Sequence, residues 1–156
     1  MVSMDVETTA SIRDILLRKG TEVETIPASA TVLEAIQRMN DEKIGALVVV
    51  EDGDNEHIAG IFTERDVLSR VVAQERPPRE VTVRDAMTRE VLCCTPDSPL
   101  GEASRLIKDH RVRHLPVCDE DGRLCGMISI GDLNAYHASD QEATVRFLHE
   151  YICGRA

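Results

Sequence analysis

The chain has few aromatic residues, and this scarcity narrows the functions open to it. Among 156 residues there is no Trp, and there are only two Phe and two Tyr. Aromatic platforms on which the bases of single-stranded nucleic acids stack are therefore scarce. Hydrophobic residues still make up 42% of the chain, which indicates a packed globular protein with an aliphatic core.

Basic residues are also in deficit. The chain has 18 Lys and Arg residues against 28 Asp and Glu residues, for a formal net charge of −10. An acidic field of this kind repels nucleic acids and anionic membrane surfaces. No run approaches the roughly 18 apolar residues that a membrane span requires, and residues 1–9 lack a secretory signal pattern. We expect a cytoplasmic protein with no nucleic-acid or membrane partner.

Several motifs that carry catalysis or hold metals are absent from the sequence. There is no phosphate-binding Gly-x-x-x-x-Gly-Lys-Ser/Thr loop and no recognisable set of nucleophile and base, and the five His residues are scattered. The five Cys residues lack the Cys-x-x-Cys spacing of metal ligands, so we interpret them as reduced, structural thiols. We therefore predict no catalytic residues, no metal and no enzyme activity. An enzyme remains the alternative that a nucleotide-turnover assay would test.

The chain contains an internal repeat. Each copy ends in a strand followed by a Gly-x-x-Ser/Thr-x-x-Asp turn, and three pairs of segments correspond: 12–16 with 83–87, 44–50 with 112–118, and 60–67 with 126–133. Two half-length copies indicate two small units packed on a pseudo-twofold axis, with equivalent clefts between them. At roughly 65 residues each copy is near the lower limit for a self-sufficient core, so we expect the copies to fold as one body.

Hydrophobic periodicity and capping signals predict the same order of elements in both copies. In the first copy we predict helices at 11–19, 31–39 and 63–73, and strands at 23–26, 44–50 and 58–62. In the second copy we predict helices at 82–88, 98–107 and 129–136, and strands at 91–94, 112–118 and 124–128; Pro99 is expected at the first helical position. The fold class is α/β (α+β), with two tandem β-α-β-β-α motifs. The predicted domains are motif 1 at 11–75, a linker at 76–81, motif 2 at 82–138, and a C-terminal helix at 139–156 with an apolar stripe.

The two repeated turns have a structural interpretation and a functional one. A Ser/Thr followed three residues later by Asp is a capping box, and Ser11 with Asp14 has the same spacing without any sign of a site. However, a helix N-terminus reached directly from a buried strand also attracts anions. An Asp in that place can accept both hydroxyls of a ribose, while the hydroxyl group and neighbouring amides face a phosphate.

The order of the elements, both turns and the segment Arg113-His114-Leu115-Pro116-Val117 resemble the paired cystathionine-β-synthase (CBS) module, also called a Bateman module. The resemblance covers about residues 11–136 and is to the free-standing prokaryotic type. It implies a non-catalytic regulatory module that binds adenosine-containing ligands of the AMP, ADP or ATP type in the clefts between the two motifs. It also implies a homodimer that buries the helices following the turns, and a regulated partner protein of unknown identity.

The resemblance assigns site residues in three groups. Thr63, Asp66, Ser129 and Asp132 are candidates for ribose and phosphate. Arg113 and His114 are candidates for phosphate, in reversed order relative to a His/Arg pair of some relatives; Gly45-Ala46 occupies the corresponding place in the first copy. We therefore expect the second cleft to be the more cationic and to bind better. Two equal sites require that Arg113 or His114 reaches across the pseudo-twofold axis, or that Lys43 or Arg65 takes their place in the first cleft.

The third group consists of short apolar residues expected to contact the adenine: Ile26, Pro27, Ile44 and Ala46 in one half, and Cys94, Thr95 and Val112 in the other. All of these would be ordinary core residues if no ligand binds. The sequence leaves open which adenosine compound is bound, with S-adenosylmethionine, NAD and dinucleotides as further possibilities. A dimerisation scaffold with empty clefts is the structural alternative.

Overall fold

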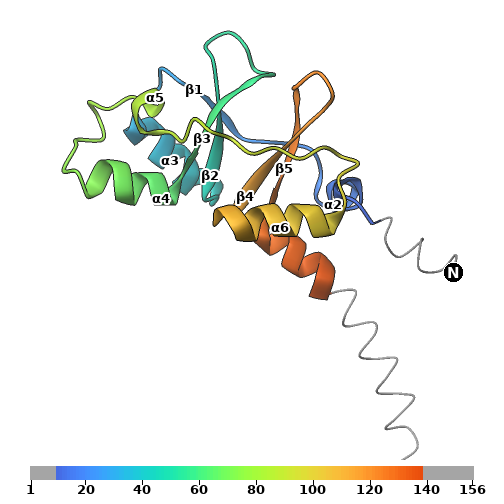
Figure 1. Cartoon of the computed structure of the whole chain (residues 1–156). Helices are drawn as coiled ribbons and strands as arrows, with labels where there is room; N and C mark the ends of the chain where they lie inside the picture. The colour runs from blue at the N-terminus through green and yellow to red at the C-terminus, as the bar shows by residue number, and fades with distance from the viewer. Residues whose placement is uncertain (1–9, 139–156) are drawn as a thin grey trace, which may run out of the picture.

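Aliphatic, β-branched segments form the strands at the centre of each repeat in the computed structural model, which describes residues 10–138 (Figure 1). In the first repeat, β1 (Thr25–Pro27) lies parallel to β2 (Ala46–Val50), and β2 lies antiparallel to β3 (Ile58–Thr63). All five residues of β2 are buried, as predicted for a continuous apolar strand. In the second repeat, β4 (His114–Cys118) pairs antiparallel with β5 (Leu124–Ser129).

The helices follow the predicted order. The first repeat has α2 (Ile12–Lys19), α3 (Val32–Glu42) and α4 (Glu64–Asp66), which continues as the π-helix η1 (Val67–Val72). The second repeat has α5 (Val83–Ala86), α6 (Leu100–His110) and a helix that starts at residue 130 and extends to residue 138. This mixed α+β arrangement of two tandem motifs confirms the predicted fold class. The predicted apolar stripe at 139–156 lies outside the described residues.

One predicted strand, at 91–94, is wrong. Only Cys94 pairs with β4, as an isolated parallel bridge to Val117. Its N–H group donates to the Pro116 carbonyl oxygen at 3.0 Å, and its carbonyl oxygen accepts from the N–H group of Cys118 at 2.8 Å.

Two prolines explain this loss. In the first repeat, the N–H groups of Val48 and Ala28 extend the pairing of β1 with β2 through hydrogen bonds of 3.1 and 2.9 Å. Pro116 and Pro96 occupy the corresponding places in the second repeat. Proline has no N–H group to donate, so the ladder shrinks to the bonds of a single residue.

The start of α6 also differs by one residue from the prediction. Pro99 is the N-cap residue and the helix begins at Leu100. Ser98 does not cap the helix; its Oγ accepts from the N–H group of Thr95 at 3.0 Å. The Ser98 hydroxyl thus stabilises the preceding turn, in competition with a capping role.

The helix that opens each repeat packs in the core of the other repeat. One buried cluster combines the strands and α3 of the first repeat with α5, including Val83 and Met87. The other combines the strands and α6 of the second repeat with α2, including Ile12 and Leu16. Figure 1 shows α5 beside β3 and α2 beside β5. Neither repeat contains a complete core by itself, which explains why the two fold as one body.

The glycine of each repeated turn makes this exchange possible. A Cβ atom on Gly60 would lie 2.6 Å from Met87 Sδ and 2.7 Å from the Thr88 carbonyl oxygen. A Cβ atom on Gly126 would lie 2.9 Å from Leu16 Cδ2. At Gly60 only glycine leaves room for the backbone of the partner segment to cross the strand so closely. The crossing brings Thr88 next to the first turn, where two backbone hydrogen bonds with Ile61 hold it.

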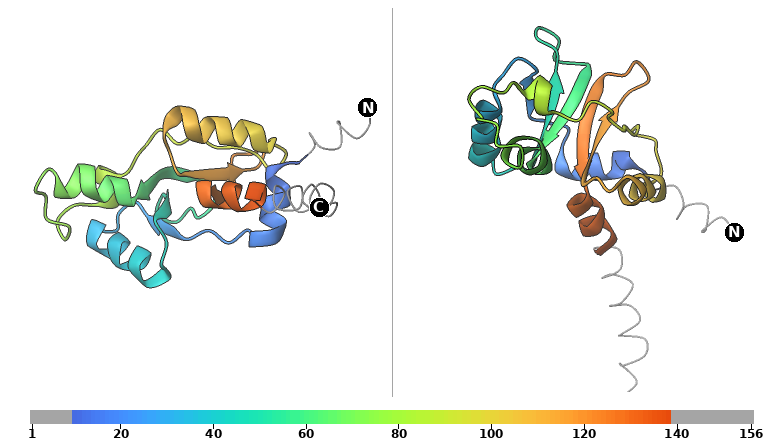
Figure 2. Two further views of the ribbon diagram at one scale, coloured as in Figure 1. Left: turned by 90° about the horizontal axis from the view of Figure 1, so that it is seen from below. Right: turned by 60° about the vertical axis from the view of Figure 1, so that its left-hand side comes forward.

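The two repeats stand side by side with β3 and β4 facing the middle of the molecule, as the second view in Figure 2 shows. The start of β4 in the second repeat therefore approaches the end of β3 in the first. In the part of the chain that the structure describes, no helix is long and apolar enough to cross a membrane.

Candidate functional site

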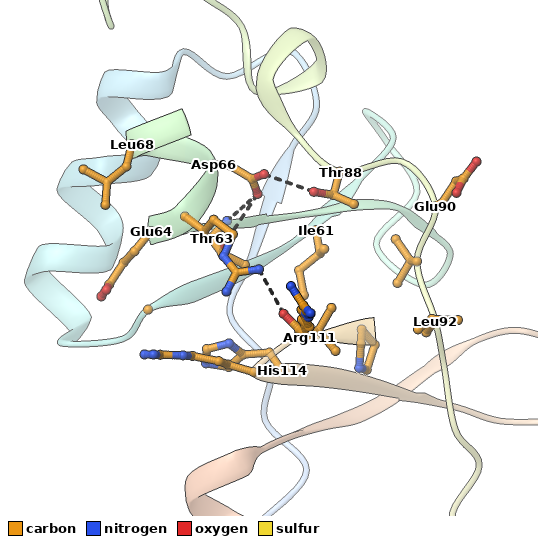
Figure 3. A pocket seen from close by; sticks show the side chains of 16 residues that line it. Ile61, Thr63, Glu64, Asp66, Leu68, Thr88, Glu90, Leu92, Arg111 and His114 are labelled. Carbon is orange, nitrogen blue, oxygen red and sulfur yellow. Dashed lines mark hydrogen bonds between the residues drawn. The ribbon is translucent and has the colours of Figure 1, made fainter. Parts of the chain in front are cut away.

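A cavity of about 550 Å³ lies between the two repeats (Figure 3). Its volume is in the range of small-molecule sites. The first repeat contributes the end of β3 and the first turn: Gly45, Ile61, Thr63, Glu64, Arg65, Asp66 and Leu68. The second repeat contributes the segment after α5 and the start of β4: Thr88, Glu90, Val91, Leu92, Arg111, Val112, Arg113, His114 and Pro116.

Asp66 is fixed in the cavity wall by three hydrogen bonds. Its Oδ2 accepts from the Thr63 N–H group at 2.9 Å and from the Thr63 hydroxyl at 3.3 Å. Its Oδ1 accepts from the Thr88 hydroxyl at 3.0 Å, and Arg70 Nε lies 3.5 Å from the same oxygen. Figure 3 shows Asp66 between Thr63 and Thr88. Thr63 and Asp66 therefore form the capping box that their spacing predicted.

Burial distinguishes this carboxylate from an ordinary helix cap. Asp66 is 4% exposed and is the one polar or charged residue that is buried among residues 10–138. A buried carboxylate is costly unless it is hydrogen-bonded or paired. The bonds from Thr63 and Thr88 and the nearby Arg70 meet that need while the carboxylate remains part of the cavity wall.

Cationic side chains from both repeats line the same cavity. Arg65 follows Thr63 on the first turn, and its Nη1 donates to the Arg111 carbonyl oxygen at 2.9 Å. Arg111 and Arg113 come from the segment that connects α6 to β4, and His114 is the first residue of β4. The acids Glu64, Asp66 and Glu90 share the lining, so the cavity carries both signs of charge.

Arg113 and His114 lie between the two turns. The sequence favoured a second cleft in which this pair accompanies Ser129 and Asp132. Both residues line the cavity of Thr63 and Asp66, across the repeat axis. They also border the second turn, because His114 pairs with Ser129 and the Arg113 carbonyl oxygen accepts from the N–H group of Ile130 at 2.8 Å. This is the crossing arrangement that the sequence left open as an alternative.

The environment of His114 disfavours its charged form. Burial lowers the pKa of the imidazole, Lys19 and Arg113 lower it further, and Asp132 and Glu64 oppose them. Since the net direction is downward from 6.5, His114 is mostly neutral at pH 7. The positive charge of the cavity therefore comes from its arginines.

The second turn has the same backbone geometry and a different environment. Asp132 Oδ2 accepts from the Ser129 N–H group at 2.8 Å, and the Asp132 N–H group donates to Ser129 Oγ at 3.0 Å. Lys19, the last residue of α2, places its Nζ 2.6 Å from Asp132 Oδ2 and 2.9 Å from the Met127 carbonyl oxygen. Burial raises the pKa of Asp132, but the hydrogen bonds from Lys19 and Ser129 outweigh it, and the net shift is downward.

The predicted adenine contacts divide between the cavity and the core. Val112 lines the cavity. The others do not: Ile26, Ala46 and Cys94 are buried in the protein interior, Ile44 is partly buried, and Pro27 and Thr95 are exposed. Their part in any ligand contact stays a prediction.

The cavity wall includes residues that were not predicted from the sequence, among them Thr88, whose hydroxyl donates to Asp66, and its neighbours Glu90 and Leu92. Thr88 reaches the first turn because α5 is exchanged between the repeats, and no local pattern reports that exchange. The paired glycines at 60 and 126 are the available signal, since each marks the close approach of an exchanged segment. In the described part of the chain, no group of three or more His, Cys, Asp or Glu side chains could hold a metal ion.

The chain is similar to several proteins of known sequence or structure. The CBSX3 protein of Arabidopsis thaliana, a mitochondrial CBS domain-containing protein, is 34% identical over 150 residues, covering 92% of this chain and 72% of the relative. A structure with CBS domains from Burkholderia ambifaria has 41% identity and a TM-score of 0.78, covering 85% of this chain and 96% of that one. A CBS domain protein from Pyrobaculum aerophilum, solved in complex with AMP, has a TM-score of 0.72 and covers 79% of this chain and 89% of its own; at 22% identity it shows the shared fold alone. The CBS domain family itself matches residues 11–73 and 83–138. The chain therefore belongs to the CBS domain family, as its two repeated turns predicted.

Proposed function

We propose that the chain is a regulatory module that binds an adenine nucleotide of the AMP, ADP or ATP type in the cavity at Thr63 and Asp66. CBS domains are regulatory modules. The observation that carries the proposal is a buried carboxylate, Asp66, in the wall of a cavity that is also lined by Arg65, Arg111 and Arg113. A nucleotide needs this combination, because its ribose presents hydrogen-bond donors and its phosphate presents negative charge.

Each part of the nucleotide has a candidate partner in the cavity. The ribose hydroxyls donate to Asp66 Oδ1, which at present accepts from the Thr88 hydroxyl at 3.0 Å. Arg113, an exposed cation at the start of β4, contacts the phosphate, and neutral His114 adds a hydrogen-bond donor. Val112 and Leu92 provide apolar surface for the base.

The cationic surface continues beyond the cavity, and this favours ligands that carry more than one phosphate. A second groove of about 430 Å³ shares Arg65, Arg111 and Arg113 with the cavity and adds Lys108 from α6. A nucleotide seated on Asp66 with its phosphates toward these arginines would extend a longer phosphate chain toward Lys108. We therefore propose tighter binding of ATP than of AMP.

Ser129 and Asp132 stay candidates for a second nucleotide. The turn has the same capping geometry as the first, but a ligand must displace Lys19 from Asp132 before the carboxylate can accept ribose hydroxyls. Thr88, the corresponding partner of Asp66, is neutral and easier to displace. On this ground we propose that the first site fills before the second.

We also propose that the module is a homodimer and transmits ligand binding through its dimer interface or a partner protein. The helix after the first turn exposes Leu68 and Val72, which are 64% and 58% exposed, and the helix after the second turn exposes Ile130. Other apolar residues of these two helices are covered: Val71 and Leu133 are buried, Val67 is partly buried, and Tyr136 lies under the guanidinium of Arg18. The cytoplasmic location and the lack of enzyme activity remain predictions.

Isothermal titration calorimetry with adenosine, AMP, ADP and ATP tests the proposal, with S-adenosylmethionine and NAD as competitors. We expect affinity to rise with the number of phosphates and to fall in the Asp66→Asn variant. Mass spectrometry of small molecules that co-purify with the protein identifies the ligand independently. No heat and no thermal shift with any of these compounds would favour the alternative, a dimerisation scaffold with empty clefts.

A further inference from the structure

Two cysteine thiols that are distant in the sequence are in contact. Cys93 Sγ lies 3.4 Å from Cys118 Sγ, although 25 residues separate them. Cys93 belongs to the segment that precedes the bridge to β4, and Cys118 is the last residue of β4. Both are free thiols, as are Cys94 and Cys125 in the described part of the chain.

The backbone around the two thiols is held in place. Cys94 and β4 exchange two hydrogen bonds, with lengths of 3.0 Å to Pro116 and 2.8 Å from Cys118. Cys94 points into the hydrophobic core, while its neighbour Cys93 is exposed. A disulfide has a sulfur–sulfur distance of about 2.05 Å, so the two atoms must approach by roughly 1.4 Å. The exposed Cys93 side chain is the more free of the two to move toward its partner.

The environments of the two thiols differ in a way that gives them different chemical roles. Cys93 is exposed and meets a dissolved oxidant first. Cys118 is buried, and burial together with the neighbouring Cys93 raises the pKa of its thiol to about 12. A buried thiol of this kind reacts slowly with outside reagents, but it is positioned to attack a sulfur atom already in contact with it.

We propose that Cys93 and Cys118 form a redox pair that a small-molecule disulfide, such as oxidised glutathione, converts to an intramolecular disulfide. The Cys93 thiolate attacks one sulfur of the oxidised glutathione; a mixed disulfide forms, and the first glutathione leaves as a thiolate that takes up a proton. The Cys118 thiol then gives up its proton, and the resulting thiolate attacks Cys93 Sγ. The bond from Cys93 to glutathione breaks, and the second glutathione leaves as a thiolate that takes up a proton. Two protein thiols are oxidised by two electrons, and one glutathione disulfide is reduced to two thiols.

The new bond would attach one wall of the cavity to β4. Leu92, the residue before Cys93, lines the cavity, and so does His114, the first residue of β4. Closing a loop of this length also restricts the unfolded chain. The oxidised protein should therefore melt at a higher temperature than the reduced protein.

The test is incubation of the full-length, reduced protein with oxidised glutathione, followed by alkylation of the remaining thiols and peptide mass mapping. We expect one intramolecular disulfide that joins Cys93 to Cys118, two fewer alkylated cysteines, a higher melting temperature, and reversal of all three by dithiothreitol. The Cys125→Ser variant is the matched control and should form the same bond.

Two variants separate the steps. Cys93→Ser changes an exposed side chain, so the fold should persist while the disulfide is lost. Cys118→Ala should stop at the mixed disulfide and carry one stable glutathione on Cys93. A wild-type protein that keeps glutathione on Cys93, or that links Cys93 to Cys125 or Cys153, would overturn the proposal, as would one that remains fully reduced.

Discussion

Lys19 Nζ lies 2.6 Å from Asp132 Oδ2. A cation from the first helix of one repeat thus forms an ion pair with the carboxylate of the turn in the other repeat. Asp66, the corresponding carboxylate, instead accepts from the neutral hydroxyl of Thr88. The two turns are thus similar in sequence, but their carboxylates have different partners: a cation at Asp132 and a neutral hydroxyl at Asp66. This inequality arises from what the exchanged segments α2 and α5 deliver to each turn.

Replacing Lys19 should strengthen nucleotide binding at the second turn. The Lys19→Met variant frees Asp132 from a competing cation, and because the pair is partly exposed we expect roughly a three- to fivefold gain in affinity. Calorimetry should report this gain as a second binding event at lower nucleotide concentration. Lys19→Arg keeps the charge and should bind as the wild type does. Equal titrations for all three proteins would show that Lys19 does not compete with the ligand.

Asp66→Asn should cost binding far more than folding. The Asn side chain keeps one acceptor oxygen for the Thr63 N–H group but loses the second oxygen and the charge, so we expect nucleotide affinity to fall on the order of a hundredfold. The cost in unfolding free energy should be about 1–2 kcal/mol, because Thr63 and Thr88 lose part of their partner. Asp14→Asn is the matched control, since Asp14 accepts from the Ser11 N–H group at 2.9 Å and lies outside the cavity. Unchanged affinity in Asp66→Asn would reduce the first turn to a helix cap.

Arg113→Ala should distinguish binding of the phosphate from binding of the nucleoside. Loss of a charge-assisted contact should weaken AMP roughly tenfold and leave adenosine nearly unchanged. Arg105→Ala removes another exposed arginine, on α6, that does not line the cavity, and should change neither ligand. Comparable losses for AMP and adenosine would mean that Arg113 supports the fold of the site and does not contact the phosphate.

His114 should make stability depend on pH. The pKa of its imidazole is lower in the folded chain than its ordinary value of 6.5, so the folded state binds fewer protons than the unfolded state. The contribution of His114 is therefore fully present well above pH 6.5 and is lost as the pH falls through and below that value. Urea denaturation of His114→Gln between pH 7.5 and 5.5 should show a smaller decline than the wild type. His137→Gln, at an exposed site, should follow the wild type; parallel curves for His114→Gln would contradict the prediction.

The homodimer prediction is tested at Leu68 and Val72. Two glutamates at these positions place charge on the exposed apolar surface, and light scattering should then give the monomer mass of 17.3 kDa where the wild type gives about twice that value. Leu17→Glu is the control, because Leu17 is 78% exposed on α2, away from this surface. A wild-type protein that is monomeric at micromolar concentration would refute the prediction directly.

Patterns that are local in the chain predicted the order of the helices and most of the strands. The buried strand β2 follows from a continuous aliphatic run, and the two turns follow from capping residues at fixed spacing, because backbone preference and burial act over a few residues. The reason for the absence of a strand at 91–94 is also present in the sequence. Pro96 and Pro116 remove two amide donors, but this matters only once the facing partners are known.

The composition of the site was decided by the tertiary structure. Thr63 and Asp66 could be identified from their turn, yet their neighbours Thr88 and Arg113 come from another repeat, where no spacing rule connects them. The same exchange of α2 and α5 brings Lys19 to Asp132, and the pairing of Cys94 with β4 brings Cys93 to Cys118. The sequence by itself determined two CBS motifs with a carboxylate at each turn. Only their packing decided which charge faces each carboxylate, because contacts between distant segments depend on how the whole chain closes around its two shared cores.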